Sequence, residues 1–278
     1  MTEAQVFSRQ WAPPTGVLGR ILAETVERVA AISSADRDAI ERRASIIARA
    51  PSFIDAMCGS TVAVIAEMKR RSPSKGAIRE SIAAELQGVA YERGGASAIS
   101  VLTEPLHFGG NVADLESTRA RVGIPLLRKD FHIDELQLHE ARAAGASAVL
   151  LIVRALSPEK LAAMIERATS LELEPLVEVH TESELALAIE LGARVIGINS
   201  RDLETLNMDA QVPERLLGLV PSGTIAIAES GIESRADVEA RACWGADAVL
   251  IGSALSASGD PESAVRALTG VARSARAH

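Results

Sequence analysis

Short apolar runs recur along the chain from residue 62 onward, and charged, alanine-rich stretches with helical spacing lie between them. Each run is apolar throughout, without alternating polar positions, which predicts a strand covered on both faces. Strands that alternate with helices in this way are typical of a parallel sheet with crossover helices. The eight runs span residues 62–66, 98–102, 125–127, 148–153, 175–179, 195–198, 224–228 and 248–251.

A Gly-Ala dipeptide precedes every second run, which indicates a shared turn. Gly95, Gly145, Gly192 and Gly245 lie just before the second, fourth, sixth and eighth runs. A glycine that follows a helix can adopt the left-handed conformation that ends the helix. Alternate units with the same turn chemistry favour a barrel built from repeated βα units.

The length of 278 residues is normal for one (β/α)8 barrel of about 250 residues plus extensions. A doubly wound open sheet is the competing architecture, but that fold usually has about five or six strands and often a glycine-rich first turn. Here Glu67, Met68 and Lys69 follow the first of eight runs. We therefore predict the α/β class and a (β/α)8 TIM barrel over residues 61–268.

The first 60 residues predict helices rather than strands. Apolar positions at helical spacing predict helices over residues 21–31 and 36–50, and Pro51 ends the second. We predict that residues 1–60 form a helical extension and that residues 269–278 form a partly frayed tail. The whole chain, 1–278, is then a single barrel domain.

The composition and net charge of the chain limit the kinds of partner that it can bind. Hydrophobic residues make up 47% of the chain and aromatic residues 3%, which suits helices packed on buried strands. The net charge of −8 argues against a nucleic-acid binder, although a locally positive pocket can still hold an anionic substrate. No apolar run reaches the roughly 18 residues of a membrane span, and the N-terminus lacks the apolar core of a signal peptide. Cys58 and Cys243 lie outside any C-x-x-C pair, so we expect free thiols in a cytoplasmic protein. The alanine-rich helices carry many charges and show no obvious apolar patch, so we predict a monomer.

Polar and charged residues follow most of the predicted strands. Barrel active sites form at the carboxyl ends of the strands, so side chains far apart in sequence would meet at one mouth. Taken alone, each of these residues could merely stabilise the end of a strand or form an ion pair within a loop. Together they are costly at the ends of apolar strands unless they pair or take part in chemistry. The candidates are Glu67, Lys69, Lys129, Asp130, Glu178, Asn199, Arg201 and Glu229, whereas the five histidines have no metal-ligand spacing.

Two loops predict a phosphate site. In many barrels a phosphate group binds at the loops after the seventh and eighth strands, beside the N-terminus of a short helix. The dipeptides at these places are Ser230-Gly231 and Gly252-Ser253. Glycines let backbone N–H groups approach an anion, and the serine hydroxyls add donors.

The chain contains six distinctive segments, at residues 65–76, 100–104, 125–131, 176–180, 196–203 and 228–232. Together they resemble the indole-3-glycerol-phosphate synthase family. The resemblance implies a carboxy-lyase of tryptophan biosynthesis, EC 4.1.1.48, that needs no metal and no organic cofactor. It implies decarboxylating ring closure and dehydration of 1-(2-carboxyphenylamino)-1-deoxyribulose 5-phosphate, a small phosphorylated substrate, to indole-3-glycerol phosphate. It also implies that the N-terminal helical extension caps the barrel mouth.

The resemblance implies roles for sixteen residues. Lys129 matches the general acid that protonates the ketone, Glu178 matches the group that transfers a proton during dehydration, and Lys69 matches a residue near the substrate carboxylate. Arg201 matches a residue that closes over the site. The rest match polar residues around the reacting centre (Glu67, Asn199, Glu229), phosphate contacts (Ser72, Ser230, Gly231, Gly252, Ser253) and the apolar slot for the aryl ring (Phe108, Phe131, Leu150, Leu203).

Physical chemistry adds expectations about charge, and rival functions stay open. A lysine beside another cation should have a lowered pKa, and glutamates at a dry mouth should have raised pKa values. Phosphoribosylanthranilate isomerase and the tryptophan synthase α subunit would share the phosphate loops but would not need Lys69, Lys129 and Glu178 together. A non-catalytic phosphosugar-binding barrel is a rival from a different class, and a second copy serving specialised indole metabolism would keep the activity in another context. His107 and Asn111 depart from residues common in the family, which leaves their loop contacts open.

Overall fold

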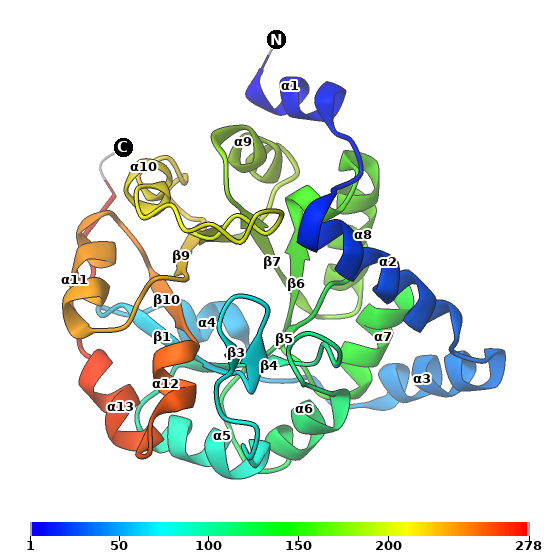
Figure 1. Cartoon of the computed structure of the whole chain (residues 1–278), viewed down its shortest axis with the longest axis horizontal. Coiled ribbons are helices and arrows are strands. Elements are labelled where there is room, and N and C mark those ends of the chain that lie inside the picture. Colours follow the sequence, from blue (N-terminus) through cyan, green and yellow to red (C-terminus); the bar gives the residue numbers. More distant parts are fainter. Residues whose placement is uncertain (1, 277–278) are drawn as a thin grey trace.

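Eight parallel strands close into a barrel in the computed structural model, which describes residues 2–276. The strands are β1 (Ala63–Met68), β4 (Ala98–Leu102), β5 (Leu126–Lys129), β6 (Ala148–Ile152), β7 (Glu174–Val179), β8 (Val195–Asn199), β9 (Ile225–Glu229) and β10 (Ala248–Ile251). They follow chain order round the barrel, and β1 pairs with both β4 and β10 (Figure 1). This closure confirms the (β/α)8 prediction and excludes the open doubly wound sheet.

Helices surround the barrel, at least one after each strand (Figure 1). Asn111, Asp134 and Ser234 each form a capping box that satisfies free backbone N–H groups at a helix start. The glycines of the four Gly-Ala dipeptides have φ between +74° and +97°, which confirms the predicted left-handed helix ends. The helices are α5 (Ala84–Arg93), α6 (Val112–Arg119), α7 (Glu135–Ala143), η1 (Val153–Ala155), α8 (Pro158–Ser170), α9 (Glu182–Glu190), α10 (Val212–Leu217), α11 (Arg235–Cys243), α12 (Ser253–Ala257) and α13 (Pro261–Leu268).

Alternate residues of each strand serve two different cores. On β1, Val64 and Ala66 pack in the cluster between sheet and helices, whereas Ala63 and Ile65 pack in the cluster that fills the barrel lumen. Successive side chains of a strand point to opposite faces, so Glu67 shares the inward register of Ala63 and Ile65. The apolar pattern of the strand thereby decides which polar side chain reaches the mouth.

The N-terminal extension contains four helices, of which the sequence predicted two. They are α1 (Glu3–Gln10), α2 (Gly16–Ala30), α3 (Ser34–Ile46) and α4 (Phe53–Met57). The helix predicted over 36–50 ends earlier because Ile47 adopts an extended backbone. Helix α2 runs along the right-hand side of the barrel in Figure 1, and its Leu18 and Ile21 join the lumen cluster, as do Phe53 and Met57 of α4. Helices therefore precede β1 as predicted, and they complete the inner core.

Two further segments differ from the prediction. A two-stranded hairpin, β2 (Arg71–Ser72) and β3 (Gly76–Ala77), lies in the loop after β1. The described part of the tail, 269–276, is packed rather than frayed: the backbone N–H of Val62 donates to the carbonyl of Val271 at 2.8 Å, and Arg273 and Arg276 both pair with Asp247. Buried ion pairs and a backbone hydrogen bond thus hold the tail, while its residues 277–278 lie outside the described part.

Candidate active site

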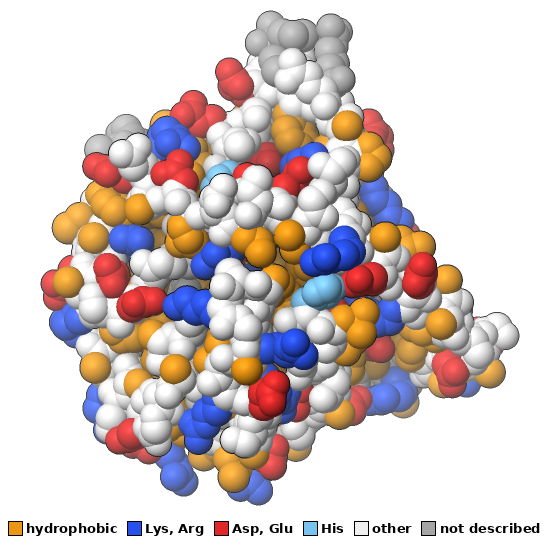
Figure 2. All heavy atoms as spheres, viewed as in Figure 1, with side chains coloured by type: hydrophobic (Ala, Val, Ile, Leu, Met, Phe, Trp, Pro, Cys, Tyr) orange, Lys and Arg blue, Asp and Glu red, His pale blue; other side chains and the backbone are white. Residues whose placement is uncertain are grey.

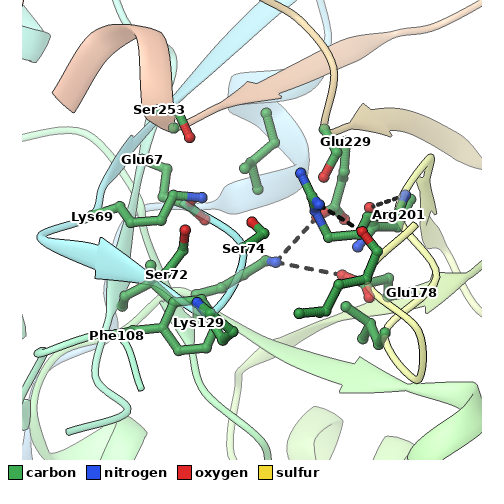
Figure 3. A pocket seen from close by; sticks show the side chains of 18 of the residues that line it. Glu67, Lys69, Ser72, Ser74, Phe108, Lys129, Glu178, Arg201, Glu229 and Ser253 are labelled. Atoms are coloured by element: carbon green, nitrogen blue, oxygen red, sulfur yellow. Dashed lines mark hydrogen bonds and ion pairs between the residues drawn. The ribbon is translucent and has the colours of Figure 1, made fainter. Parts of the chain in front are cut away.

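A cavity of about 270 Å³ opens at the carboxyl ends of the strands, and all sixteen residues predicted for the site line it. Figure 2 shows Lys and Arg side chains around the centre of the face that carries α2 and the β2–β3 hairpin. Figure 3 shows the labelled side chains directed toward one space. Glu67, Lys129, Glu178 and Glu229 reach it because they share the inward register of the lumen residues on their strands.

Lys129 lies at the centre of a buried ion-pair cluster. Its ammonium is 3.2 Å from a carboxylate oxygen of Glu229 and 3.4 Å from one of Glu178 (Figure 3). Beside this group, the ammonium of Lys69 lies 2.7 Å from one carboxylate oxygen of Glu67, and Lys129 is close enough to influence that glutamate as well. Two lysines therefore face three carboxylates that come from β1, β7 and β9.

The pKa of Lys129 is raised, so the prediction of a lowered value was wrong. Burial alone would lower this pKa, but the carboxylates of Glu229, Glu178 and Glu67 outweigh burial and favour the ammonium. The prediction failed because it considered a second cation and not the three carboxylates, one of which binds Lys69. Lys129 therefore keeps its charge at neutral pH and presents a fixed cation to the cavity.

The glutamates of the cluster differ from one another. Burial raises the pKa of Glu229 to about 8, against the opposing effect of Lys129, and this confirms the expected rise. Burial would also raise the pKa of Glu67, but Lys69 and Lys129 outweigh it and the pKa is lowered, so the prediction was wrong for this residue. The cavity thus holds one glutamate with a raised pKa, Glu229, near another with a lowered pKa, Glu67.

The loops after β9 and β10 bring backbone close to the cavity. Ser230 and Gly231 both have left-handed φ values, +68° and +66°. For a non-glycine residue this conformation costs about 1–3 kcal/mol, and such strain is found mostly at functional sites. Arg241 holds the turn by donating to the carbonyl oxygen of Gly231 at 3.2 Å. In the next loop a Cβ on Gly252 would lie 2.3 Å from the carboxylate of Glu67, so a larger residue there would displace the Glu67–Lys69 pair.

Part of the lining is apolar and suited to an aromatic ring. The rings of Phe108 and Phe131 have centroids 6.2 Å apart and are tilted by 40°. Leu150 lies in the same apolar cluster, and Leu18 and Ile21 of α2 add a wall from the extension. Pocket walls of this kind, with a few convergent polar groups, are typical of small-molecule sites.

Asp130 follows Lys129 directly, but its side chain is fully buried and holds the fold together. Its carboxylate accepts hydrogen bonds from Arg28 at 2.8 and 3.2 Å, from the Thr103 hydroxyl at 2.7 Å and from Arg128 at 3.2 Å. Burial would raise the pKa of Asp130, but Arg128 and Arg28 hold it well below its usual range. Because Arg28 belongs to α2, the pair ties the extension to the end of β5.

Arg201, predicted to close over the site, is held within its own loop. Its guanidinium donates to the carbonyl oxygen of Leu206 at 2.8 Å, and its backbone pairs with that of Met208. Its backbone N–H also donates to the side-chain oxygen of Asn199 at 2.9 Å. The structure therefore places Arg201 on the cavity wall, in a loop that Asn199 anchors to β8.

Some residues of the site escaped the sequence prediction. Lys75, on the loop of the β2–β3 hairpin, lines the cavity and pairs with Glu233 at 3.2 Å. Gly197 makes room for Glu229, because a Cβ there would lie 2.1 Å from a carboxylate oxygen of that glutamate. A glycine inside an apolar strand is a known sign of close approach and could have identified Gly197. The apolar spacing of residues 21–31, continued backwards, could have identified Leu18.

Within residues 2–276 no three or more histidine, cysteine, aspartate or glutamate side chains are grouped so that they could hold a metal ion. Cys58 and Cys243, both within this range, are exposed and form no disulfide. No helix of the described part is both long enough and apolar enough to cross a membrane.

A closed (β/α)8 barrel with a cavity and a buried lysine–glutamate cluster at the carboxyl ends of its strands defines the class of TIM-barrel enzymes. Solved structures show the same fold. The chain matches 3-hexulose-6-phosphate synthase from Salmonella typhimurium with a TM-score of 0.60 and 16% identity, over 74% of this chain and 96% of that one. It matches KGPDC from Streptococcus mutans with a TM-score of 0.58 and 14% identity, over 75% of this chain and 95% of that one.

The family model described as Indole-3-glycerol phosphate synthase matches residues 18–268. Indole-3-glycerol phosphate synthase 1 of Streptomyces coelicolor is 47% identical over 90% of this chain and 91% of its own length. The Indole-3-glycerol phosphate synthase of Mycolicibacterium vanbaalenii is 49% identical over 90% of each chain. The chain belongs to the indole-3-glycerol phosphate synthase family. Its activity is that of a carboxy-lyase of tryptophan biosynthesis, EC 4.1.1.48, which confirms the prediction from the sequence.

Proposed function

We propose that the cavity binds 1-(2-carboxyphenylamino)-1-deoxyribulose 5-phosphate and converts it to indole-3-glycerol phosphate, CO2 and water. The position of the Lys129 ammonium between Glu178 and Glu229, in one cavity with the Ser230-Gly231 turn, carries the proposal. The substrate joins a phosphate, a ketone and a carboxylated aromatic ring. The lining offers hydrogen-bond donors for the phosphate, a fixed cation for the ketone oxygen and an apolar slot for the aromatic ring. Each part of the substrate therefore has a complementary part of the cavity.

The two ends of the substrate are assigned to different walls. Backbone N–H groups and hydroxyls of the glycine turns are the natural partners of the phosphate. Lys69 is assigned to the substrate carboxylate, and Arg201 is assigned to close over the bound molecule. The phosphate contacts are Ser72, Ser230, Gly231, Gly252 and Ser253, and the aryl slot comprises Phe108, Phe131, Leu150 and Leu203.

Lys129 acts on the ketone oxygen. The ring carbon that bears the carboxylate attacks the ketone carbon, and the oxygen takes a proton from the ammonium of Lys129. Because the neighbouring carboxylates keep this lysine charged, it also stabilises the negative charge that develops on the oxygen. Loss of CO2 then returns the electrons of its bond to the ring system. Glu178 assists the departure of the hydroxyl as water by transferring a proton, while Glu67, Asn199 and Glu229 are the polar groups around the reacting centre.

The ionisation of Glu229 should appear in the pH dependence of activity. Its pKa is raised to about 8, so above this pH the cavity gains a negative charge that opposes an anionic substrate. We expect kcat/KM to fall above about pH 8, by up to roughly tenfold per pH unit, since kcat/KM reports groups of the free enzyme. Steady-state kinetics from pH 6 to 10 measure this.

Two variants assign the fall to its cause. Glu229→Gln should lack the decline above pH 8, whereas Glu233→Gln, which alters an exposed carboxylate at the rim of the cavity, should keep it. A parent profile that stays flat to pH 10, or a decline that survives in Glu229→Gln, would contradict the assignment.

Turnover of the substrate tests the proposed function directly. Formation of the indole product is followed by its fluorescence, and CO2 release is measured in the same reaction. We expect stoichiometric indole product and CO2. A protein that binds the compound but never forms the indole product would refute the proposal and leave a barrel enzyme with an altered substrate or a non-catalytic phosphosugar-binding barrel.

We also propose a cytoplasmic, monomeric protein. The two exposed, unpaired cysteines fit a reducing compartment. The large exposed apolar side chains are scattered over different elements rather than grouped into one patch, which supports a monomer.

A further inference from the structure

The loop after β4 carries Phe108 into the cavity, and a buried glutamate shapes its backbone. Glu104 is almost fully buried and accepts hydrogen bonds from the backbone N–H groups of Leu106, His107 and Phe108 at 2.9, 2.7 and 3.0 Å. This loop therefore keeps its turn through contacts of its own. Glu104 does not fix the distance between this loop and helix α2, which forms the opposite wall of the aryl slot.

A polar contact joins these two walls. The Nε2 atom of His107 lies 2.5 Å from a carboxylate oxygen of Glu24, which belongs to α2. Both side chains are partly buried, with 18% and 33% of their surfaces exposed. One residue further along the loop, Phe108 lines the cavity, and one helical turn before Glu24 the buried Ile21 lines it too. The contact thus spans the two walls directly beside the apolar slot.

Helix α2 does not depend on this contact for its place. Leu18 and Ile21 are buried in the lumen cluster, and Arg28 pairs with the fully buried Asp130. Glu24 and Arg28 lie one helical turn apart, so they face the barrel together. Arg28 anchors α2 beside Phe131, and Glu24 connects it to the loop of Phe108.

We propose that Glu24 is a positioning residue that acts through His107: the pair fixes the spacing between α2 and Phe108 and so sets how tightly the aryl ring of the substrate is held. The inference rests on the proposed function, which assigns the ring to this slot. Loss of the pair widens the slot without disturbing the Ser230-Gly231 turn, which lies on the loop after β9. The binding of the ring should therefore suffer, and the binding of the phosphate should not.

Binding of two ligands separates these effects. One is the unreactive reduced analogue 1-(2-carboxyphenylamino)-1-deoxyribitol 5-phosphate, which carries the ring, and the other is ribulose 5-phosphate, which lacks it. By calorimetry, Glu24→Ala should raise the Kd of the ring-bearing ligand about tenfold, the effect of one charge-assisted hydrogen bond, and change the Kd of ribulose 5-phosphate less than about twofold. Glu27→Ala, an exposed glutamate on the same helix, should change neither.

Further variants test whether the two side chains act together. His107→Gln should reproduce the loss, and Glu24→Ala combined with His107→Gln should be no weaker than either single variant, because the two remove one interaction. Glu24→Gln keeps a hydrogen-bonding group and should recover part of the affinity. In turnover the loss should appear in KM, with kcat nearly unchanged.

The outcomes that overturn the inference differ from those that overturn the proposed function. If the parent prefers the ring-bearing ligand and Glu24→Ala prefers it equally, the positioning role is refuted and the proposed function stands. Equal weakening of both ligands would likewise refute it, because that result indicates general damage to the site. If the parent itself shows no preference for the ring, the aryl slot is refuted, and both proposals fall together.

Discussion

Replacement of Lys129 by methionine is expected to lower kcat by about 10³–10⁴-fold, the combined size of a lost proton donor and a lost charge stabiliser. Methionine has a similar length and keeps the apolar stem, but it offers no ammonium to the ketone oxygen. The lost charge also leaves Glu178 and Glu229 without their cation, at 3.4 and 3.2 Å in the parent. Single-turnover kinetics with saturating substrate measure the chemical step apart from binding.

Lys75→Met provides the matched control. Lys75 lines the same cavity, but it is half-exposed and pairs with the exposed Glu233. Exposed ion pairs contribute little, so this variant should keep kcat within about threefold of the parent. Equal losses in the two variants, or a Lys129→Met protein that keeps more than a tenth of the parent kcat, would show that Lys129 has no special role.

Replacement of Asp130 by alanine is expected to destabilise the protein by about 3–5 kcal/mol, the usual cost of removing one partner of a buried ion pair. The change removes the acceptor for Arg28, Thr103 and Arg128, and it leaves the guanidinium of Arg128 buried with one carboxylate fewer. Urea unfolding followed by circular dichroism gives the free energy of unfolding. A loss below about 1 kcal/mol would contradict the role assigned to this carboxylate.

Two further variants serve as controls for the free energy of unfolding of Asp130→Ala. Asp38→Ala, which alters an exposed aspartate on α3, should change the free energy of unfolding by less than about 0.5 kcal/mol. Asp130→Asn keeps the shape and removes the charge. Because the folded pKa of Asp130 is depressed, its contribution is present above the unfolded pKa of about 3.9 and is lost as the pH falls toward the folded value. The stability difference between the parent and Asp130→Asn should therefore shrink below about pH 4.

The strands were predictable from the sequence because a strand buried on both faces is apolar along its length. All eight runs overlap a strand of the barrel within two residues at each end. The short elements were not predictable in the same way. The β2–β3 hairpin has two residues in each strand, and α4 has five residues, so both are too short for an apolar pattern to repeat. Their structure depends on contacts with distant parts of the chain.

The membership of the site was predictable, but its electrostatics were not. Each polar residue stands at a strand end, and the closed barrel alone brings strand ends together. The sign of the pKa shift of Lys129 depends on which charges lie nearest, and these belong to Glu229 and Glu178 on other strands. The contact between Glu24 and His107 likewise depends on how α2 docks. Register and docking distances are properties of the packed chain, and a single sequence does not state them.

At the end of β5, even-numbered and odd-numbered residues have different roles. Arg128 and Asp130 pair with each other through fully buried side chains, whereas the side chains of Lys129 and Phe131 face the cavity, which Asp130 also borders. For protein engineering, this means that catalysis and robustness can be altered separately along one stretch of backbone. A library confined to positions 129 and 131 would search new chemistry on an intact scaffold. A transplant of the catalytic lysine into another barrel would need to bring Arg128, Asp130 and the helix that carries Arg28 along with it.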